Sequence, residues 1–437
     1  MNFLLSLLQT ANRFLWDGPM LLFLMGSHLF FTFRTRGIQR KLPLALKLSV
    51  KTSGKENGMS AFSSLATTLA ATLGTGNIIG ISTAIALGGP GAVFWCWLTG
   101  LFGMATTYTE CYLSLNFRKK RPDGSYLGGP MYLLKHELHA PKIAKCYAYL
   151  LLAASFCVGC STQSQAVTET LSTIFHIPVL PAGIILSILL CFALVGGVKS
   201  ISKICTFLVP VMGMFYLGAC LFLLIINAKF LVPAIHSILS SAFSLSSFGG
   251  GILGSSFLLS ARYGIARGLF TNEAGLGSAP IAAANSGAGT DSQALVLMSA
   301  TFWDTVVMCA VTGLVIVSSA LRFPALLSGY SAGDYTLAAF SLLPLAGKEF
   351  LGIAIIAFAV ATLLGWSFFG EKAAEFLFGS DQIKTYRFLY CFMIFLGSQM
   401  TLTLVWELSD FFNALMMIPN LISLFLLQKH LPQKPPF

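Results

Sequence analysis

Long apolar segments separated by short basic loops constrain this chain more than any other feature of its sequence. A helix of ~20 apolar residues crosses a bilayer, and such segments end at charges, proline or glycine clusters. Eleven occur, at residues 18–33, 61–87, 91–116, 145–170, 180–197, 204–226, 250–285, 294–319, 349–370, 387–405 and 410–428. The stretch 232–247 is too short and polar to span and is expected to lie on the surface. We therefore predict an all-α polytopic membrane protein with eleven transmembrane helices.

The composition excludes a soluble protein. Only 10% of the 437 residues are charged and 56% are hydrophobic, whereas soluble domains carry about 25% charged residues. The formal net charge is +11, but the cations lie in loops between apolar segments, where they orient a membrane protein instead of binding nucleic acid. The bilayer is thus an expected partner, and nucleic acid is not.

The basic residues predict the orientation. If the N-terminus is outside and eleven segments cross, 21 of the 27 Lys and Arg residues lie inside and four lie outside, with Arg262 and Arg267 within a span. This asymmetry follows the positive-inside rule. The segment preceding the first span has no basic residue before Arg13 and no small-residue cleavage site, so we interpret it as an amphipathic lead-in. We expect a multi-pass protein of the inner (plasma) membrane, with its N-terminus outside and its C-terminus in the cytoplasm.

Known catalytic patterns are missing from the sequence. It contains no Walker A lysine loop, no HExxH and no convincing protease spacing. Cys157 and Cys160 have CxxC spacing, but without a second pair or a nearby His we interpret them as apolar helix residues. We predict neither an enzyme nor a resident cofactor.

The second apolar segment contains Gly74, Thr75, Gly76 and Asn77 in a row. Gly costs roughly 1 kcal/mol against Ala inside a helix, and a buried amide needs a partner. A helix broken here would present free N–H groups to a carboxylate and free carbonyls to a small cation. The alternative is that both glycines make a close helix contact. The adjoining Asn and a second break, at 268–277, favour a binding site.

Setting the first span aside, the other ten divide into two sets of five, and each set begins with an interrupted segment. Five is odd, so the second set starts on the opposite side of the membrane. Inverted repeats with matching broken helices indicate the central site of a transporter. The expected organisation is an N-terminal helix and basic loop (1–60), a first repeat (61–226), an extracellular connection (227–249), a second repeat (250–428) and a cytoplasmic tail (429–437).

Several other polar residues fall within the spans. Asp304 lies near the midplane and can be a cation ligand, a proton carrier or the partner of an Arg. We expect Glu273 to pair with Arg267 or Arg262, Glu110 to be a solvated or paired residue at a helix end, and His28 to be packed. These assignments follow from sequence position alone.

Two further spans offer groups for a ligand. In the fourth, Gln163 or Gln165 can donate to a carboxylate or bond to a neighbouring helix. In the ninth, Thr362 and Trp366 share a helix face at i, i+4 and would give a cavity one hydroxyl and one apolar wall.

At these residues the chain resembles the alanine or glycine:cation symporter family over nearly its full length. The matching blocks are GTGNIIGISTAIALGGPGAVFWCW, GMATTYTE, GGPMY, ARGLFTNEAGLGSAP, FWDTVVMCAVTGL, LLGWSFFGEK and NALMMIPNLISL. The resemblance implies a leucine-transporter-like 5+5 inverted repeat preceded by one extra helix. It also implies Na⁺- or H⁺-driven uptake of small neutral amino acids.

The resemblance also implies site residues. Gly74, Thr75, Gly76 and Asn77 correspond to the part of the family's site that holds the substrate backbone and a cation. Gln163 matches the family's Gln, although the preceding Asn is Cys160 here; Phe270 and Trp366 correspond to its aromatic walls. Ile79 and Ile81 stand where the family often has Ala and Val, so substrate preference can differ.

We therefore predict a secondary transporter that imports alanine, glycine or a similarly small amino acid together with Na⁺. Asn77 and Thr362 are the first candidates for ligands of the ion, and Asp304 is a further candidate. The alternatives are coupling to protons through Glu273 or Asp304 and, from another class, a channel or receptor for small zwitterions. The sequence does not define the oligomeric state.

Overall fold

The computed structural model describes residues 2–50, 60–122, 126–243, 257–286, 289–344 and 346–432. Parts of four predicted regions lie outside the described residues. They are residues 51–59 of the basic loop, 244–249 of the extracellular connection, 250–256 of the seventh apolar segment and 433–437 of the tail.

The N-terminal half of the described chain is almost entirely helical. Its helices are α1 (Asn2–Trp16), α2 (Pro19–Arg34), α3 (Leu42–Val50), α4 (Ala61–Thr72), α5 (Ile79–Gly88), α6 (Gly91–Asn116), α7 (Pro130–Tyr132), α8 (Pro141–Phe156), α9 (Thr162–Phe175), α10 (Val179–Val195), α11 (Gly197–Ile226) and α12 (Ala228–Ala242). Two short antiparallel strands, β1 (Lys119–Lys120) and β2 (Tyr126–Leu127), form a hairpin between α6 and α7.

The C-terminal half continues the pattern. Its helices are α13 (Phe257–Asn272), α14 (Ala279–Ala284), α15 (Thr290–Thr301), α16 (Ala310–Arg322), α17 (Tyr335–Phe340), α18 (Gly347–Phe378), α19 (Ile383–Ser398) and α20 (Leu402–Leu427). Two π-helical segments interrupt longer helices: Cys157–Ser161 joins α8 to α9, and Phe302–Cys309 joins α15 to α16.

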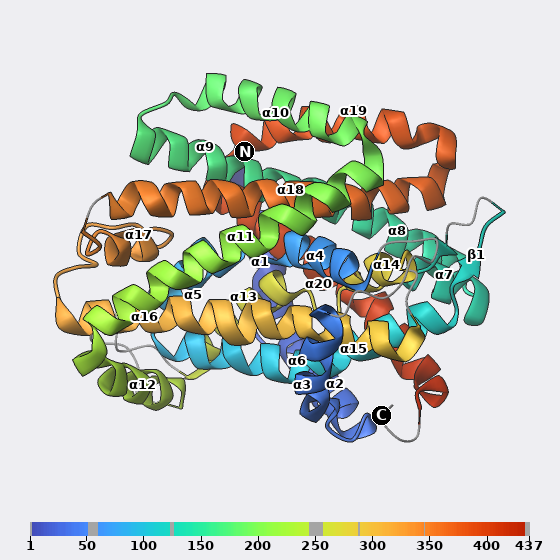
Figure 1. Ribbon diagram of the computed structural model, residues 1–437, viewed down its shortest axis with the longest axis horizontal. Coiled ribbons are helices and arrows are strands. Elements are labelled where there is room, and N and C mark those ends of the chain that lie inside the picture. The colour runs from blue at the N-terminus through green and yellow to red at the C-terminus, as the bar shows by residue number, and fades with distance from the viewer. Residues whose placement is uncertain are drawn as a thin grey trace.

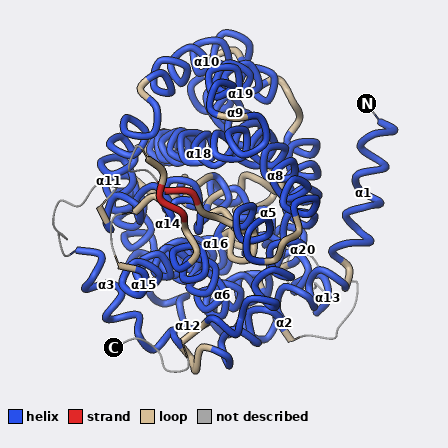
Figure 2. Tube along the Cα trace, turned by 90° about the vertical axis from the view of Figure 1, so that its right-hand side faces the viewer, coloured by secondary structure: helices blue, strands red, loops and turns tan. Residues whose placement is uncertain are grey.

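Most of the helices lie side by side in one bundle, with α18 crossing its middle (Figure 1). Figure 2, which looks along many of them, shows α9, α10 and α19 together at one edge and α1 apart at another. On the outer side of α10, Ile185, Leu189 and Phe192 are exposed, as expected for a helix that faces lipid. The polar breaks described below lie in the interior instead.

Membrane spans are only partly identified by helix length and composition. Five stretches are long and apolar enough to cross: 141–175, 200–226, 290–322, 347–378 and 402–430. A sixth is the pair 5–16 and 19–34 if that pair, bent by 42°, counts as one span. Each of the eleven predicted segments overlaps a described helix, but broken helices are too short to pass this criterion, so eleven spans stays a prediction.

Both predicted helix breaks are present, one of them displaced. The first segment stops at Thr72 and resumes at Ile79, with a 3₁₀ turn at Thr75–Asn77 between, as GTGN predicts. In the seventh segment the prediction of a break at 268–277 is wrong at its start, because α13 remains helical through Asn272. The break there covers 273–278, where Glu273, Gly275 and Gly277 all have positive φ.

Candidate functional site between the two helix breaks

The backbone of the first break is held by two amide side chains. Asn77 folds back on its own turn, and its Oδ1 accepts a hydrogen bond from the Gly74 N–H at 3.0 Å. Gln163, on α9, accepts from the Thr75 N–H at 3.2 Å and from the Thr75 hydroxyl at 2.9 Å. Thr75 and Asn77 are fully buried. The amides therefore satisfy backbone groups that a continuous helix would have paired internally.

The two glycines are required by close neighbours. A Cβ at Gly74 would lie 2.5 Å from the Thr362 Oγ1, and a Cβ at Gly76 would lie 2.6 Å from a methyl of Thr271 and 2.8 Å from the Phe270 ring. All three separations are below van der Waals contact. Gly76 thus brings the first break against the last turn of α13, directly before the second break.

One group of oxygens joins the first break to α18. The Thr362 hydroxyl lies 3.0 Å from the carbonyl oxygen of Ala70 and 3.5 Å from that of Leu73. These carbonyls belong to the last turn of α4 and its cap, where the break leaves them without helical donors. A hydroxyl and two freed carbonyls form an all-oxygen set of the kind that hard cations prefer.

A second group of oxygens joins the first break to the π-helical segment. The Asn77 Nδ2 donates to the Asp304 Oδ1 at 2.7 Å and to the Asp304 carbonyl at 3.1 Å. The Thr305 hydroxyl donates to the other carboxylate oxygen at 2.6 Å, and Thr271 lies 3.3 Å from Thr305. Asp304 is fully buried and, within the described residues, its partners are an amide and a hydroxyl instead of the Arg considered above.

The two π-helical segments that interrupt longer helices both lie at this site. Gly159, in Cys157–Ser161, packs so closely on α18 that a Cβ there would lie 2.1 Å from the Trp366 Cβ, and Gln163 lies two residues beyond the end of that segment. The other segment, Phe302–Cys309, contains Asp304 and Thr305. A π turn inserts an extra residue into the helical register and often marks a functional position.

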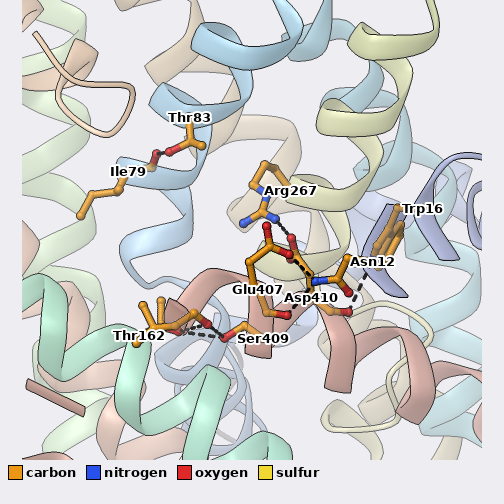
Figure 3. Close-up of polar contacts among 10 residues, drawn as sticks. Asn12, Trp16, Ile79, Thr83, Thr162, Arg267, Glu407, Ser409 and Asp410 are labelled. Carbon is orange, nitrogen blue, oxygen red and sulfur yellow. Dashed lines mark hydrogen bonds and ion pairs between the residues drawn. The ribbon is translucent and has the colours of Figure 1, made fainter. Parts of the chain in front are cut away.

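The second break is held by carboxylates. Glu273 accepts a hydrogen bond from the Trp366 Nε1 at 2.7 Å and another from the Ser278 hydroxyl. The expected pairing of Glu273 with Arg267 or Arg262 is wrong, because Arg267 pairs with Asp410 and Arg262 pairs with Asp17 (Figure 3 shows the first pair). Both arginines precede the break on α13, whereas Glu273 has turned towards α18.

Glu110 is also placed differently from its prediction as a solvated or paired end residue. It is 1% exposed, and its Oε1 accepts from the Gly275 N–H at 3.1 Å and from the Asn420 Nδ2 at 2.6 Å. It therefore fixes the second break to α6 and α20. His28 is fully buried and lies 2.8 Å from the Thr106 hydroxyl, which confirms the prediction of a packed histidine.

Aromatic side chains close the space around the breaks. The Phe270 ring lies 4.4 Å from that of Trp406, and Trp366 is fully buried on α18. Gln165, the alternative to Gln163, lines a separate cavity together with Glu169 and with Ile78 and Ile79, which directly follow the 3₁₀ turn of the first break. Trp406 was missed because it lies among ordinary apolar residues of α20.

All the predicted site residues lie in one buried region, but they are distributed among separate contacts. Gly74, Thr75, Gln163 and Thr362 meet at one side of the first break, and Asn77 meets Asp304 at the other. Thr271, Thr305 and the carbonyls of Ala70 and Leu73 were missed. A carbonyl carries no sequence signal, and the two threonines become site residues only through the fold.

Two broken helices meeting inside an all-helical membrane bundle define a secondary transporter. The profile of the sodium:alanine symporter family matches residues 1–434. A sodium/alanine symporter, AgcS, of Methanococcus maripaludis is 41% identical over 97% of this chain and 94% of its own length. The chain therefore belongs to the sodium:alanine symporter family, and it is a sodium-coupled amino-acid transporter in the membrane, not an enzyme.

Other similar proteins agree with this class. A probable sodium/glutamine symporter, GlnT, of Bacillus subtilis is 34% identical over 96% of this chain and 87% of its own length. The crystal structure of MhsT in complex with L-phenylalanine superposes with a TM-score of 0.59 at 15% sequence identity, covering 85% of this chain and 88% of that one. This similarity confirms the leucine-transporter-like fold.

Proposed function

We propose that this protein imports alanine, glycine or a similarly small neutral amino acid, driven by Na⁺. The observation that carries the proposal is the close contact of the first break, at Gly76, with Phe270 and Thr271 in the last turn of α13, directly before the second break, in a region that contains buried polar groups. The names of its relatives mention both alanine and glutamine, so the family alone does not define the substrate.

The substrate carboxylate is proposed to bind at the N-terminal end of α5. That end carries roughly half a positive charge from its free N–H groups. Gly74, Thr75 and Gly76 would supply backbone contacts, and the Gln163 side chain, which already bonds to Thr75, would orient them. The ammonium group would face carbonyls freed at the end of α13, so that no charged side chain is needed for either end of the zwitterion.

Substrate size is proposed to be limited by Phe270 and Trp366. Both rings are buried, and Trp366 is fixed at its Cβ by Gly159 and at its Nε1 by Glu273. A ring held at both ends moves little, so it excludes larger side chains by contact. This arrangement supports a preference for a methyl group or hydrogen on the substrate Cα.

The coupling ion is proposed to bind through the oxygen groups of the site. Thr362 with the carbonyls of Ala70 and Leu73 is one set, and Asn77 with Asp304 is the other. The first set fits Na⁺ because all three of its groups are oxygens. In the second set Asp304 supplies carboxylate oxygens, whereas Asn77 presents its Nδ2 to Asp304 and would have to turn to offer its Oδ1. Two separate sets would allow two ions, or one ion and one structural contact.

Transport would follow from the two repeats, 61–226 and 250–428, moving about this site. The proposed location is the inner membrane with the N-terminus outside, as the basic residues predict. Proton coupling remains the second candidate, since Asp304 and Glu273 are buried and neither forms an ion pair within the described residues.

The test is uptake of radiolabelled alanine and glycine into liposomes containing the purified chain, with Na⁺ and pH gradients varied independently. We expect saturable, concentrative uptake that follows the Na⁺ gradient. Uptake that follows only the pH gradient would show that protons, and not Na⁺, drive transport. Passive, non-saturating flux would exclude a transporter and favour a channel.

A further inference from the structure

Glu110, Gly275 and Asn420 form a buried hydrogen-bonded group at the second break. Glu110 is 1% exposed, and Asn420 is fully buried. The Glu110 Oε1 accepts from the Gly275 N–H at 3.1 Å and from the Asn420 Nδ2 at 2.6 Å, and the same Nδ2 donates to the Gly275 carbonyl at 2.8 Å. The group therefore joins α6 and α20 to both polar atoms of one peptide residue in the break.

The two oxygens of the Glu110 carboxyl have different surroundings. Both N–H donors bond to Oε1, whereas Oε2 has no hydrogen-bond partner among the described residues. The two oxygens of an ionised carboxylate both accept, but a carboxylic acid has one carbonyl oxygen that accepts and one hydroxyl that donates. Oε1 thus has the partners of a carbonyl, and Oε2, which receives no donor, has the place of a hydroxyl.

An acceptor for such a hydroxyl lies on the Asn420 amide. Its Oδ1 is buried and also has no partner within the described chain, and the bond from Nδ2 to Oε1 holds the amide against the carboxyl. Oδ1 lies so close to Gly277 that a Cβ there would be 2.9 Å away, and the Gly277 N–H lies near the Glu110 carboxyl without satisfying Oε2. The neighbouring Tyr147 hydroxyl does not serve Oδ1, because it donates to the Leu276 carbonyl at 2.8 Å.

The charges around Glu110 do not favour a carboxylate. None of the five ion pairs of the described residues involves Glu110. The titratable groups facing it in this part of the chain are the carboxyl of Glu273 in the break, the Tyr147 hydroxyl of α8 and the Cys111 thiol of its own helix. Burying an ionised carboxylate without a cation is unfavourable, and the group is neutralised instead.

We propose that Glu110 and Asn420 form a proton-binding site, in which the Glu110 Oε2–H donates to the Asn420 Oδ1 while the Asn420 Nδ2 donates to Oε1. A single proton then satisfies both unpartnered oxygens, and acid and amide are joined by two hydrogen bonds. The proton fixes the orientation of the amide, which in turn holds the Gly275 carbonyl. Because the pair is enclosed, the proton stays in place during transport. Glu110 is therefore a positioning residue for the second break and not a carrier of a coupling proton.

The test compares infrared spectra of the purified full-length protein, since a carboxylic acid and an ionised carboxylate absorb at different frequencies. In the difference between wild type and Glu110→Gln at neutral pH, we expect loss of one carboxylic-acid band without loss of carboxylate bands. Glu349→Gln, at an exposed carboxyl in the first turn of α18, is the matched control and should lose carboxylate bands only. Loss of carboxylate bands in Glu110→Gln would overturn the proposal.

A second variant tests the partner and serves even where Glu110→Gln does not fold. Asn420→Leu removes the acceptor of the Oε2 proton, so the acid band of Glu110 should shift to the frequency of a more weakly hydrogen-bonded acid. An acid region identical to that of the wild type would overturn the pairing with Asn420.

Uptake into liposomes then tests the positioning role. Glu110→Gln can keep both bonds of the pair, because its NH₂ group donates to the Asn420 Oδ1 and its oxygen still accepts. Asn420→Leu cannot, and its uptake rate should fall about tenfold, the equivalent of one hydrogen bond. We expect Glu110→Gln to be faster than Asn420→Leu and to keep the wild-type response to Na⁺ and pH gradients. Loss of a pH-gradient response in Glu110→Gln would instead make Glu110 a proton carrier. The infrared spectra do not depend on transport, so this proposal and the proposed function can fail independently.

Discussion

The two helix breaks differ in the groups that stabilise them. The backbone of the first is held by the side-chain amides of Asn77 and Gln163, its only carboxylate contact described runs through Asn77 to Asp304, and none of residues 73–78, all described, has a positive φ. The second has three residues with positive φ, at Glu273, Gly275 and Gly277, and its contacts run to the buried carboxylates of Glu273 and Glu110. This difference indicates that the conformation of the first break can change, whereas that of the second is fixed.

A non-glycine residue in the left-handed region costs roughly 1–2 kcal/mol, and such a conformation persists only where its surroundings determine it. At Glu273 those surroundings are Trp366 and Ser278, which bond to both carboxylate oxygens. The first break has no residue in the left-handed region, and the hydrogen bonds of its backbone to the amides of Asn77 and Gln163 can be exchanged for a carboxylate or a cation. We infer that the first break binds and rearranges while the second serves as its rigid support.

The largest effect is expected from Gly76→Ala, which disrupts the close contact between the first break and the last turn of α13. Its Cβ would lie 2.6 Å from Thr271 and 2.8 Å from Phe270, and overpacking of this kind costs about 1–3 kcal/mol. Uptake should be lost while the chain still folds, as judged by its elution as a single species in detergent. Gly213→Ala on α11 meets no atom within 4 Å and should transport normally. Normal uptake by Gly76→Ala would show that transport does not require the close contact of Gly76 with Thr271 and Phe270.

Asn77→Ala tests whether the first break couples transport to Na⁺. The change leaves the buried Asp304 without its amide donor, at a cost of about 1–3 kcal/mol, and removes the link between the break and the π-helical segment. We expect Na⁺-stimulated uptake to disappear. Asn285→Ala is the control, because that amide bonds to the Ile281 carbonyl of its own helix and should retain the response. An unchanged Na⁺ dependence in Asn77→Ala would remove this residue from the cation site.

Glu273→Gln tests the rigidity of the second break. The new amide oxygen can still accept from Trp366, but its NH₂ group cannot accept from Ser278. We expect the maximal uptake rate to fall about tenfold, the equivalent of one hydrogen bond, with the Na⁺ dependence intact. The measurement is initial uptake against Na⁺ concentration at two external pH values. Loss of a pH-gradient response in the variant alone would instead identify Glu273 as a proton carrier.

The two breaks also differ in how well the sequence predicts their positions and contacts. GTGN predicts the first break correctly, because two glycines and an Asn within an apolar run disfavour a continuous helix. The second break was placed too early, since the GLFTN stretch remains helical and the chain turns only at Glu273. Trp366, which bonds to Glu273, and Asn420, which bonds to Glu110, lie 93 and 310 residues away from them along the chain. Contacts at such separations depend on the packing of whole helices and leave no local pattern.

The smallest change is expected from Trp366→Phe, which tests whether Trp366 limits substrate size or only holds the second break in place through Glu273. The shorter ring loses the N–H that bonds to Glu273 at 2.7 Å and frees space beside the site, so larger amino acids should enter. One methylene of extra room changes selectivity by about tenfold or more at most sites, and here the ratio of valine to alanine uptake should rise several-fold. Trp303→Phe, at a half-exposed ring, should leave the ratio unchanged. An unaltered ratio in Trp366→Phe would mean that the ring only holds Glu273 in place, and the size limit would then belong to Phe270 at the end of α13.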